Sequence, residues 1–549
     1  MSKNLSELSG RKGLRENLFE ELGIAATETG AVSKEKAESL AKDFLMGSAN
    51  VYGAATFYDF LRPENQGKKV YVCNGSACLT AGTQDELKSK LSKEFLHDEI
   101  GEMCCLGRCH ENSAFNINNR NYSGSDIDNI SDIKAGITIP MDSYHVASVG
   151  TPILTTTFPG TKQFYTILEK ALKMTPNELL TELKTSGLRG RGGAGFPIGF
   201  KLESCKNTEG NIKFIVCNAD EGDPGAYSDR YLLEQRPHSV LLGMIIAGYI
   251  SGANTGVVYI RGEYPEAIAI TQEAIAEIKE LGYTGQNILN SGFNYDFKVI
   301  KAQGAYICGE ETALLSSIEG QRPEVRVRPP YPTQHGLFNK PTVVNNVETL
   351  ACIPWVIDNG GAAFAAIGKG KSTGTKLVSL DGFFNRPGIY EVDMGTPLNT
   401  VVNELGQGFK STVKAMHIGG PLGGLVPVEK INSLTVDFES FSQNGFLLGH
   451  ASVVCLPESY PVISYINHLF KFTAHESCGK CFPCRLGSTR GYEMIEKAMN
   501  SDYKMDRELF TDLITTMEIG SLCALGGGLP LPIRNALQYF DAELQHFFD

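Results

Sequence analysis

Eight of the 14 cysteines fall into two spaced groups, and these groups indicate metal chemistry. In the first group, Cys478, Cys481 and Cys484 follow one another at every third residue, and Cys523 lies further along the chain. Three thiolates from one loop and a distant fourth can enclose a cubane cluster. A structural zinc site more often pairs two Cys-x-x-Cys motifs. The three-plus-one spacing therefore favours a [4Fe–4S] cluster over zinc.

The second group consists of two cysteine pairs. Cys73 and Cys78 are separated by four residues, and Cys105 and Cys109 by three. Two pairs of thiolates suit the two irons of a [2Fe–2S] cluster, and neither spacing is that of a zinc ribbon or a thiol redox motif. Cys104 is an alternative to Cys105. We expect Cys105 to be the ligand, because the glycines that follow Cys73 and Cys105 let the backbone close over the sulfides.

A glycine-rich stretch, residues 190–195, matches the G-x-G-x-x-G pattern of dinucleotide-binding folds. In those folds the pattern follows a strand, whereas this stretch follows a helix-like segment. A phosphate loop for a flavin is the better account, because four glycines bring backbone N–H groups close to an anion and Lys201 can add positive charge. A flexible surface loop is the alternative.

Carboxylates gather in two further stretches, residues 218–225 and 304–312, which follow predicted strands. The carboxyl edge of an open α/β sheet is where such sheets bind ligands. Carboxylates can hold ribose hydroxyls and ring N–H groups, and Tyr306 or Phe196 can stack on a flat ring. Taken without the cysteine groups, these acids would be ordinary helix caps and turns.

The elements expected to position these groups alternate along the chain. Residues 1–70 have helical periodicity, and a strand at 69–73 and a helix at 84–95 follow. Residues 121–150 are polar and show little periodicity, which indicates a linker. Helices and strands then alternate, with a helix expected at 176–186 and strands at 214–217 and 256–261, as in a doubly wound sheet. Short strands around a helix at 398–405 begin near residue 376, and residues from 464 onward are helical.

Composition and charge exclude several functions. The 549 residues carry a formal charge of −12, which argues against nucleic acid as a partner. The most apolar stretch, residues 239–260, is interrupted by Ser251, Asn254 and Thr255, so we expect no direct membrane insertion. Residues 1–11 do not read as a signal peptide, and we expect a cytoplasmic protein. Six cysteines outside the two groups are expected to be packing residues: Cys104, Cys205, Cys217, Cys308, Cys352 and Cys455.

Five motifs carry a family resemblance: Gly187–Phe196, the Asn-Ala-Asp-Glu run at 218–221, Tyr-Ile-Cys-Gly-Glu-Glu-Thr at 306–312, residues 341–349, and Glu-Ser-Cys-Gly-Lys-Cys at 476–481. Residues from about 151 to the C-terminus resemble the NADH-binding flavoprotein subunit of respiratory complex I, a module also found in NAD-linked hydrogenases and formate dehydrogenases. Residues 35–118 resemble the thioredoxin-like [2Fe–2S] partner of that subunit, which is fused here in shortened form.

The resemblance implies a multidomain α/β fold. The implied domains are a thioredoxin-like [2Fe–2S] domain (1–120), a linker (121–150), a Rossmann-like FMN and NADH domain (151–370), a ubiquitin-like (β-grasp) α+β domain (371–460) and a helical-bundle [4Fe–4S] domain (461–549).

The resemblance also implies site residues. FMN is expected to contact Gly190, Arg191, Gly192, Gly193, Lys201, Asn218, Asp220, Tyr306, Gly309, Glu310, Asn345, Asn346 and Thr349. NAD(H) is expected near Phe196, Glu311, Arg328 and Tyr331, with Glu311 and Asp223 as positioning residues. Asp223 stands where complex I has a glutamate near the nicotinamide, and Ser204 where it has a second aromatic residue near the adenine. The preference for NAD over NADP therefore stays open.

The function implied is hydride transfer between NAD(H) and FMN, and transfer of single electrons between FMN and both clusters, with other redox subunits of a larger complex as partners. Flavin chemistry requires no general base from the protein. One alternative is an electron-bifurcating, ferredoxin-linked subunit, although such subunits often carry an extra ferredoxin domain after the cubane. The other is a non-catalytic electron-wire or docking subunit, which flavin absorbance would exclude.

Overall fold

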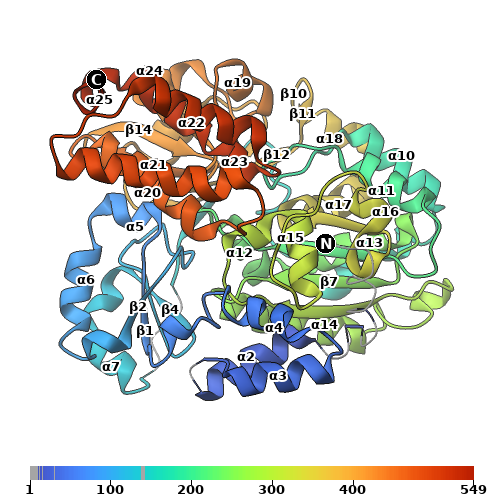
Figure 1. The fold of residues 1–549 in the computed structure, drawn as a ribbon. Coiled ribbons are helices and arrows are strands. Elements are labelled where there is room, and N and C mark those ends of the chain that lie inside the picture. The colour runs from blue at the N-terminus through green and yellow to red at the C-terminus, as the bar shows by residue number, and fades with distance from the viewer. Residues whose placement is uncertain (1–9, 11–12, 15–16, 30, 138–141) are drawn as a thin grey trace.

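The computed structural model describes the chain except residues 1–9, 11–12, 15–16, 30 and 138–141. The expectation about a signal peptide at 1–11 thus falls outside the described residues, apart from Gly10. Figure 1 shows three regions with sheets of their own and a group of C-terminal helices. Short 3₁₀ turns connect many elements: η1 (Pro63–Asn65), η2 (His97–Glu99), η3 (Gly124–Asp128), η4 (Ile288–Asn290), η5 (Tyr306–Gly309), η6 (Leu337–Asn339), η8 (Val428–Ser433) and η9 (Gln545–Phe547).

The first region holds a four-stranded sheet in the order β2-β1-β3-β4. Strand β1 is parallel to β2 and antiparallel to β3. The apolar side chains of β1 are buried against Leu87 and Leu91 of α6. This contact gives the first region a small hydrophobic core of its own. The elements are β1 (Val70–Cys73), β2 (Ile100–Met103), β3 (Phe115–Ile117), β4 (Arg120–Tyr122), α5 (Ser76–Ala81), α6 (Gln84–Leu91) and α7 (Ile130–Lys134).

The second region is built on a parallel sheet in the order β8-β7-β6-β9. Its strands are β6 (Phe214–Ala219), β7 (Thr255–Ile260), β8 (Asp296–Lys301) and β9 (Thr342–Asn346). Strands β6 and β7 are buried almost throughout, which is why they read as continuous apolar runs. The helices are α8 (Thr161–Phe164), α9 (Thr166–Ala171), α10 (Pro176–Ser186), α11 (Ile198–Asn207), α12 (Ser228–Gln235), α13 (Pro237–Ser251), α14 (Pro265–Glu280), α15 (Glu311–Ile318), α16 (Pro332–His335), α17 (Val347–Asn359) and α18 (Gly361–Ala365).

Different parts of the chain cover the two faces of the parallel sheet. Helices α13 and α17 pack on one face. The other face is covered by α15 together with the N-terminal helices α2 (Leu18–Thr29), α3 (Lys34–Asp43) and α4 (Ser48–Ala55). Figure 1 shows these N-terminal helices below the parallel sheet and apart from β1 and β2. The helices that open the chain therefore complete the core of the second region.

The third region is a six-stranded sheet in the order β15-β14-β16-β12-β13-β5. Its outer strand β5 (His145–Val149) lies within residues 121–150 and pairs in parallel with β13. The stretch expected to be a linker thus contains α7 and β5. Strand β5 is a half-exposed edge strand, so it lacks the apolar alternation by which strands are predicted. The other elements are β10 (Gly368–Lys369), β11 (Ser372–Thr373), β12 (Thr375–Leu380), β13 (Gly388–Asp393), β14 (Val413–Ile418), β15 (Gly424–Pro427), β16 (Ser452–Pro457), α19 (Phe438–Gln443) and a π-helical turn, η7 (Thr400–Leu405).

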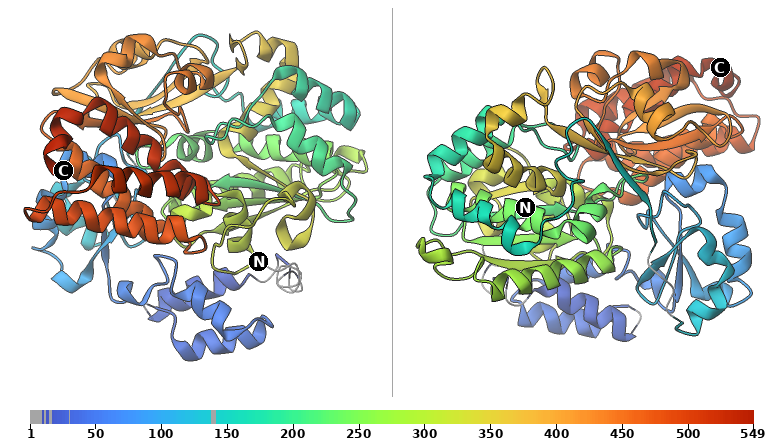
Figure 2. Two further views of the ribbon diagram at one scale, coloured as in Figure 1. Left: turned by 45° about the horizontal axis from the view of Figure 1, so that its top comes forward. Right: turned by 180° about the vertical axis from the view of Figure 1, so that it is seen from behind.

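The C-terminal part is helical and packs on this sheet through α24 and β15. Figure 2 shows these helices from two further sides. They also reach the first region, where Ser76 Oγ lies 3.0 Å from His468 Nε2. Among the described residues, no helix is both long and apolar enough to cross a bilayer. The helices are α20 (Val462–Glu476), α21 (Phe482–Asn500), α22 (Arg507–Gly520), α23 (Ala524–Gly528), α24 (Pro530–Tyr539) and α25 (Asp541–Leu544).

Candidate functional site

The glycine-rich loop connects α10 to α11 and packs on the N-terminus of α17. A Cβ on Gly192 would lie 2.9 Å from the Cβ of Asn346, so this position admits only glycine without a shift. The backbone N–H of Arg191 donates to Thr349 Oγ1 at 2.8 Å. The Arg191 guanidinium is buried and donates to the Thr373 carbonyl, so Arg191 offers the loop only its backbone. Gly193 has φ +113°, where a side chain would be strained.

Polar side chains converge at the carboxyl ends of the parallel strands. Asn218, the penultimate residue of β6, donates its side-chain N–H to the Gly309 carbonyl at 2.8 Å. Three neighbouring polar atoms are buried without a hydrogen-bond partner, namely Asp220 Oδ2, Asn345 Nδ2 and Glu310 Oε1, the last of which has only Arg328 Nη2 at 3.6 Å. Buried polar groups are normally hydrogen-bonded, so these orphaned donors and acceptors fit a polar cofactor such as FMN. Burial raises the pKa of Asp220 well above its usual value.

An exposed rim lies next to this edge. Lys201 Nζ contacts Glu311 Oε2 at 2.9 Å, and Arg328 Nη1 contacts Glu311 Oε1 at 3.0 Å. Burial acts to raise the pKa of Glu311, but Lys201 and Arg328 outweigh it and hold the pKa below its usual value. The side chains of Phe196 and Tyr331 are 51% and 54% exposed. Phe196 and Tyr331 are thus accessible aromatic rings, and Glu311 is a carboxylate held by two cations.

Tyr306 connects the two carboxylate stretches. Its hydroxyl donates to Asp223 Oδ1 at 2.6 Å, and its backbone N–H donates to Glu476 Oε2 at 2.8 Å. A Cβ on Gly222 would lie 2.7 Å from the Tyr306 ring. The hydroxyl, the backbone and the ring of Tyr306 are thus each fixed by a separate contact. Ser204, by contrast, hydrogen-bonds to Thr333.

The four cysteines of the three-plus-one group meet where α20, α21 and α23 begin or end. Cys478 follows α20, Cys481 precedes α21, Cys484 lies in the first turn of α21, and Cys523 precedes α23. The thiols of Cys478, Cys481 and Cys523 all lie near that of Cys484. A Cβ on Gly526 would approach Cys484 Sγ to 3.0 Å. Free thiols in a cradle closed by glycine fit a cubane cluster.

The two cysteine pairs of the first region are also brought together. Cys105 Sγ and Cys109 Sγ are 3.6 Å apart, and a hydrogen bond with Cys78 lowers the pKa of Cys73 to about 7. All four thiols are buried. The backbone N–H of Gly225, from the first carboxylate-bearing stretch, donates to Cys109 Sγ at 3.2 Å. The chemistry and pairing of these donors fit a [2Fe–2S] cluster, and that site adjoins the carboxyl edge of the parallel sheet.

Cys104 faces a different environment from Cys105. It lines a small cavity with Arg261, Tyr306 and Glu476, and burial raises the pKa of its thiol well above the usual value. Cys105 instead contacts Cys109.

We therefore expect Cys104→Ala to keep the [2Fe–2S] EPR signal and Cys105→Ala to abolish it. The two variants remove the same atoms from adjacent positions, so each serves as a control for the other. If the signal survives Cys105→Ala but not Cys104→Ala, the ligand must be reassigned.

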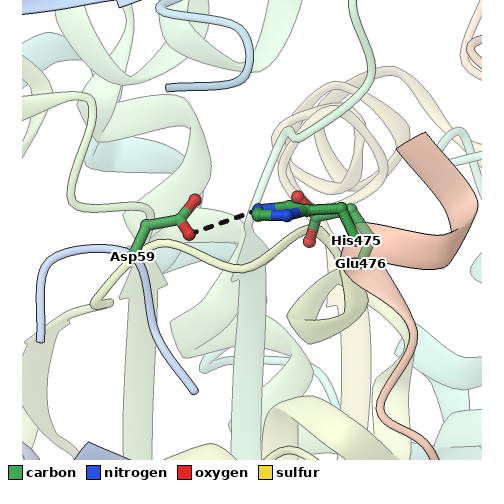
Figure 3. Close-up of side chains that lie close together, drawn as sticks. All are labelled: Asp59, His475 and Glu476. Atoms are coloured by element: carbon green, nitrogen blue, oxygen red, sulfur yellow. Dashed lines mark ion pairs between the residues drawn. The ribbon is translucent and has the colours of Figure 1, made fainter. Parts of the chain in front are cut away.

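A charged cluster joins the N-terminal and C-terminal parts of the chain at this cavity. Figure 3 shows Asp59, which follows α4, facing His475 and Glu476 at the end of α20. His475 Nε2 lies 3.5 Å from Asp59 Oδ1. Arg62 Nη1 lies 3.4 Å from the same oxygen and 3.2 Å from His475 Nε2. Because Arg62 already supplies a positive charge to this group, we interpret it as an ion-pair network that joins the two parts of the chain, and not as a metal site. The sequence carries no spacing signal for it, since its two halves lie more than 400 residues apart.

Three regions of the chain match known protein families. Residues 183–355 match the Nuo51 FMN-binding domain, and residues 464–547 match the NADH-ubiquinone oxidoreductase-F iron–sulfur binding region. Residues 6–137 match the thioredoxin-like [2Fe–2S] ferredoxin family. The matched regions contain the glycine loop and both cysteine groups.

Full-length relatives agree with these matches. An NADH-quinone oxidoreductase subunit of Rhizobium meliloti (strain 1021) is 42% identical over 69% of this chain and 91% of its own length. The NADP-reducing hydrogenase subunit HndC of Solidesulfovibrio fructosivorans is 42% identical over 70% of this chain and 79% of its own length. A crystal structure of NAD⁺-reducing [NiFe]-hydrogenase in the air-oxidized state superposes with a TM-score of 0.84 at 28% identity, covering 98% of this chain and 95% of that one.

Fold and site together define an iron–sulfur flavoprotein subunit, an oxidoreductase of multidomain α/β architecture with a thioredoxin-like region at its N-terminus. The chain belongs to the NADH-quinone oxidoreductase family, as a relative of the subunits that carry the FMN-binding domain. The resemblance inferred from the five motifs is thereby confirmed.

Proposed function

We propose that this chain transfers a hydride between NAD(H) and FMN and passes single electrons between FMN and its two iron–sulfur clusters, as one subunit of a larger cytoplasmic redox complex. The observation that carries the proposal is the convergence of three sites. The carboxyl edge with its orphaned polar atoms is linked to one cysteine group by the Gly225–Cys109 hydrogen bond. It is linked to the segment that precedes the other group by the hydrogen bond from Tyr306 to Glu476.

Each site residue has a part in this proposal. For FMN we propose backbone contacts from the glycine loop and polar contacts from the strand ends: Gly190, Arg191, Gly192, Gly193, Lys201, Asn218, Asp220, Tyr306, Gly309, Glu310, Asn345, Asn346 and Thr349. For NAD(H) we propose Phe196, Glu311, Arg328 and Tyr331. For the clusters we propose Cys478, Cys481, Cys484 and Cys523 as [4Fe–4S] ligands, and Cys73, Cys78, Cys105 and Cys109 as [2Fe–2S] ligands.

We propose finer fold names as well. The parallel sheet with helices on both faces supports a Rossmann-like domain at 151–370, and the mixed sheet with η7 supports a ubiquitin-like domain at 371–460. The stack of α20 to α25 supports a helical-bundle domain at 461–549. We keep 1–120 as the thioredoxin-like domain, with its helices α2 to α4 packed on the parallel sheet of the second region. We keep 121–150 as its linker, which contributes β5 to the third region.

The protein itself binds the flavin and the nucleotide, orients them relative to each other and excludes water from the site. Bound FMN supplies two-electron chemistry toward the nicotinamide and one-electron chemistry toward the clusters. Glu311, fixed by Lys201 and Arg328, offers a carboxylate for the ribose hydroxyls of the nucleotide. Phe196 and Tyr331 offer faces on which flat rings can stack. Asp223, held by the Tyr306 hydroxyl, positions groups near the flavin and need not transfer a proton.

The electron acceptor or donor in this proposal is another protein. The relatives are named as subunits of quinone oxidoreductases and hydrogenases, which supports a partner subunit here. Purified chain should oxidise NADH rapidly with artificial one-electron dyes. It should be slow in quinone-, hydrogen- or formate-linked assays until the native partner, identified by co-purification and mass spectrometry, is added. Full-rate turnover of a physiological small-molecule acceptor by the chain alone would contradict the subunit assignment.

A further inference from the structure

A second charged cluster lies beside the glycine loop, and of its three residues only Glu221 belongs to one of the five motifs. Glu221 follows β6, Asp229 lies in the first turn of α12, and His450 precedes β16. All three side chains are at least nine-tenths buried. His450 Nε2 lies 3.3 Å from Asp229 Oδ2 and 3.7 Å from Glu221 Oε1. The cluster therefore joins the six-stranded sheet to the region that carries the glycine loop.

The hydrogen-bond roles in this cluster are fixed by its chemistry. Asp229 presents a carboxylate oxygen 3.3 Å from His450 Nε2, and because a carboxylate oxygen accepts, this Nε2 donates. Glu221 accepts the backbone N–H groups of Asp229 and Arg230 at 2.9 and 3.0 Å. Burial alone would lower the pKa of His450, but Asp229 and Glu221 outweigh it and raise the pKa to about 9. Burial, and next the charge of Asp229, raise the pKa of Glu221 to about 8, so the positive imidazole pairs chiefly with the carboxylate of Asp229.

Asp229 also contacts Asn346, the residue against which the glycine loop packs. Asn346 Nδ2 donates to Asp229 Oδ2 at 2.6 Å, and Asn346 Oδ1 accepts the N–H groups of Glu348 and Thr349 at the start of α17. Hydrogen bonds at both Nδ2 and Oδ1 thus hold the side-chain amide of Asn346 in one orientation. Gly192 packs directly on the Asn346 side chain.

The backbone of the His450 segment touches the same loop. A Cβ on Gly193 would lie 3.7 Å from Gly449 and 3.9 Å from His450 N. Two further atoms of the cluster, His450 Nδ1 and Asp229 Oδ1, are buried without a partner. The cluster therefore packs directly against the loop proposed for FMN, and it retains one nitrogen and one oxygen atom that could each form a further hydrogen bond.

We propose that His450 is a positioning residue of the FMN site: its Nε2–H holds Asp229, and Asp229 fixes the Asn346 amide against which the glycine loop packs. This inference rests on the proposed placement of FMN at the loop. An ion pair that only joined two regions would stabilise the fold without affecting flavin affinity, so the two roles can be separated by measurement.

The test is a double-mutant cycle on the FMN dissociation constant of the full-length chain with both clusters loaded. We expect His450→Gln and Asn346→Ala each to weaken FMN binding by about tenfold, and the double variant to be no weaker than Asn346→Ala alone, because residues in one network do not act additively. Full additivity, or an unchanged dissociation constant in His450→Gln, would overturn the inference.

His417→Gln is the matched control, since His417 is also a buried histidine of the six-stranded sheet region. Its ring lies 2.8 Å from Tyr465 Oη and 3.2 Å from the Gly423 carbonyl, with no carboxylate among these partners. This variant should lower the unfolding temperature but change the FMN dissociation constant by less than about twofold, since distant and independent sites act separately. An equal loss of flavin in both histidine variants would indicate a merely structural role.

Two outcomes separate this inference from the function itself. Wild-type chain that binds no FMN would overturn the proposed function and this inference with it. FMN binding unaffected by Asn346→Ala would overturn the placement and the inference but leave the function. If His450→Gln does not fold, Asp229→Asn takes its place in the cycle, with the same non-additivity expected.

Discussion

Cys481→Ser should remove the [4Fe–4S] cluster and reduce the iron content from about six to about two per chain, with loss of one reduced-state EPR signal. Cys481 stands at the start of α21, between the buried thiols of Cys478 and Cys484. Serine keeps the size of the side chain, so the fold should persist while a ligand is lost. Iron analysis and EPR of the purified variant measure both effects.

Cys205→Ser provides the control. Cys205 is buried, as Cys478 and Cys484 are, but it lies on α11, outside both cysteine groups. Its substitution should leave about six irons in place. Unchanged iron in Cys481→Ser, or equal loss in both variants, would contradict the ligand assignment.

Gly192→Asp should abolish FMN binding and NADH–dye activity. Even a Cβ at this position would meet the Cβ of Asn346 at 2.9 Å, and aspartate adds a negative charge where a phosphate is expected. Flavin content measured after denaturation, together with dye reduction, checks the result.

Gly53→Asp makes the same substitution on α4, where a Cβ would meet no atom within 4 Å. That variant should retain its flavin and its activity. Retention of FMN in Gly192→Asp would show that the glycine loop is not the phosphate site.

Helix caps, apolar runs and closely spaced cysteines can be recognised in the sequence because they depend on residues that are neighbours along the chain. The helix expected at 176–186 forms with those bounds as α10, because Thr175 caps it and Gly187 ends it with φ +64°. The apolar runs at 214–217 and 256–261 form the buried strands β6 and β7. The cysteine groups were visible because ligands that come from one loop must be closely spaced in sequence.

Other features depend on contacts between distant parts of the chain. Amphipathic periodicity shows that α2 to α4 have an apolar side, but not that this side covers the parallel sheet. The Gly225–Cys109 hydrogen bond and the His450 cluster each join residues more than 100 positions apart. The resemblance implied the FMN contacts, yet the buried Arg191 guanidinium shows that a matched position need not present its side chain.

In the proposed function one chain carries a flavin and two clusters that NADH can reduce. Anaerobic titration of the purified full-length chain with NADH, followed by flavin absorbance and EPR together, measures all three centres in one experiment. We expect one FMN and about six irons per chain, bleaching of the flavin, and distinct EPR signals from a [4Fe–4S] and a [2Fe–2S] cluster as the sample is reduced to lower potentials. A chain that contains flavin and iron but whose spectra do not change on addition of NADH would show that it does not oxidise NADH through these centres.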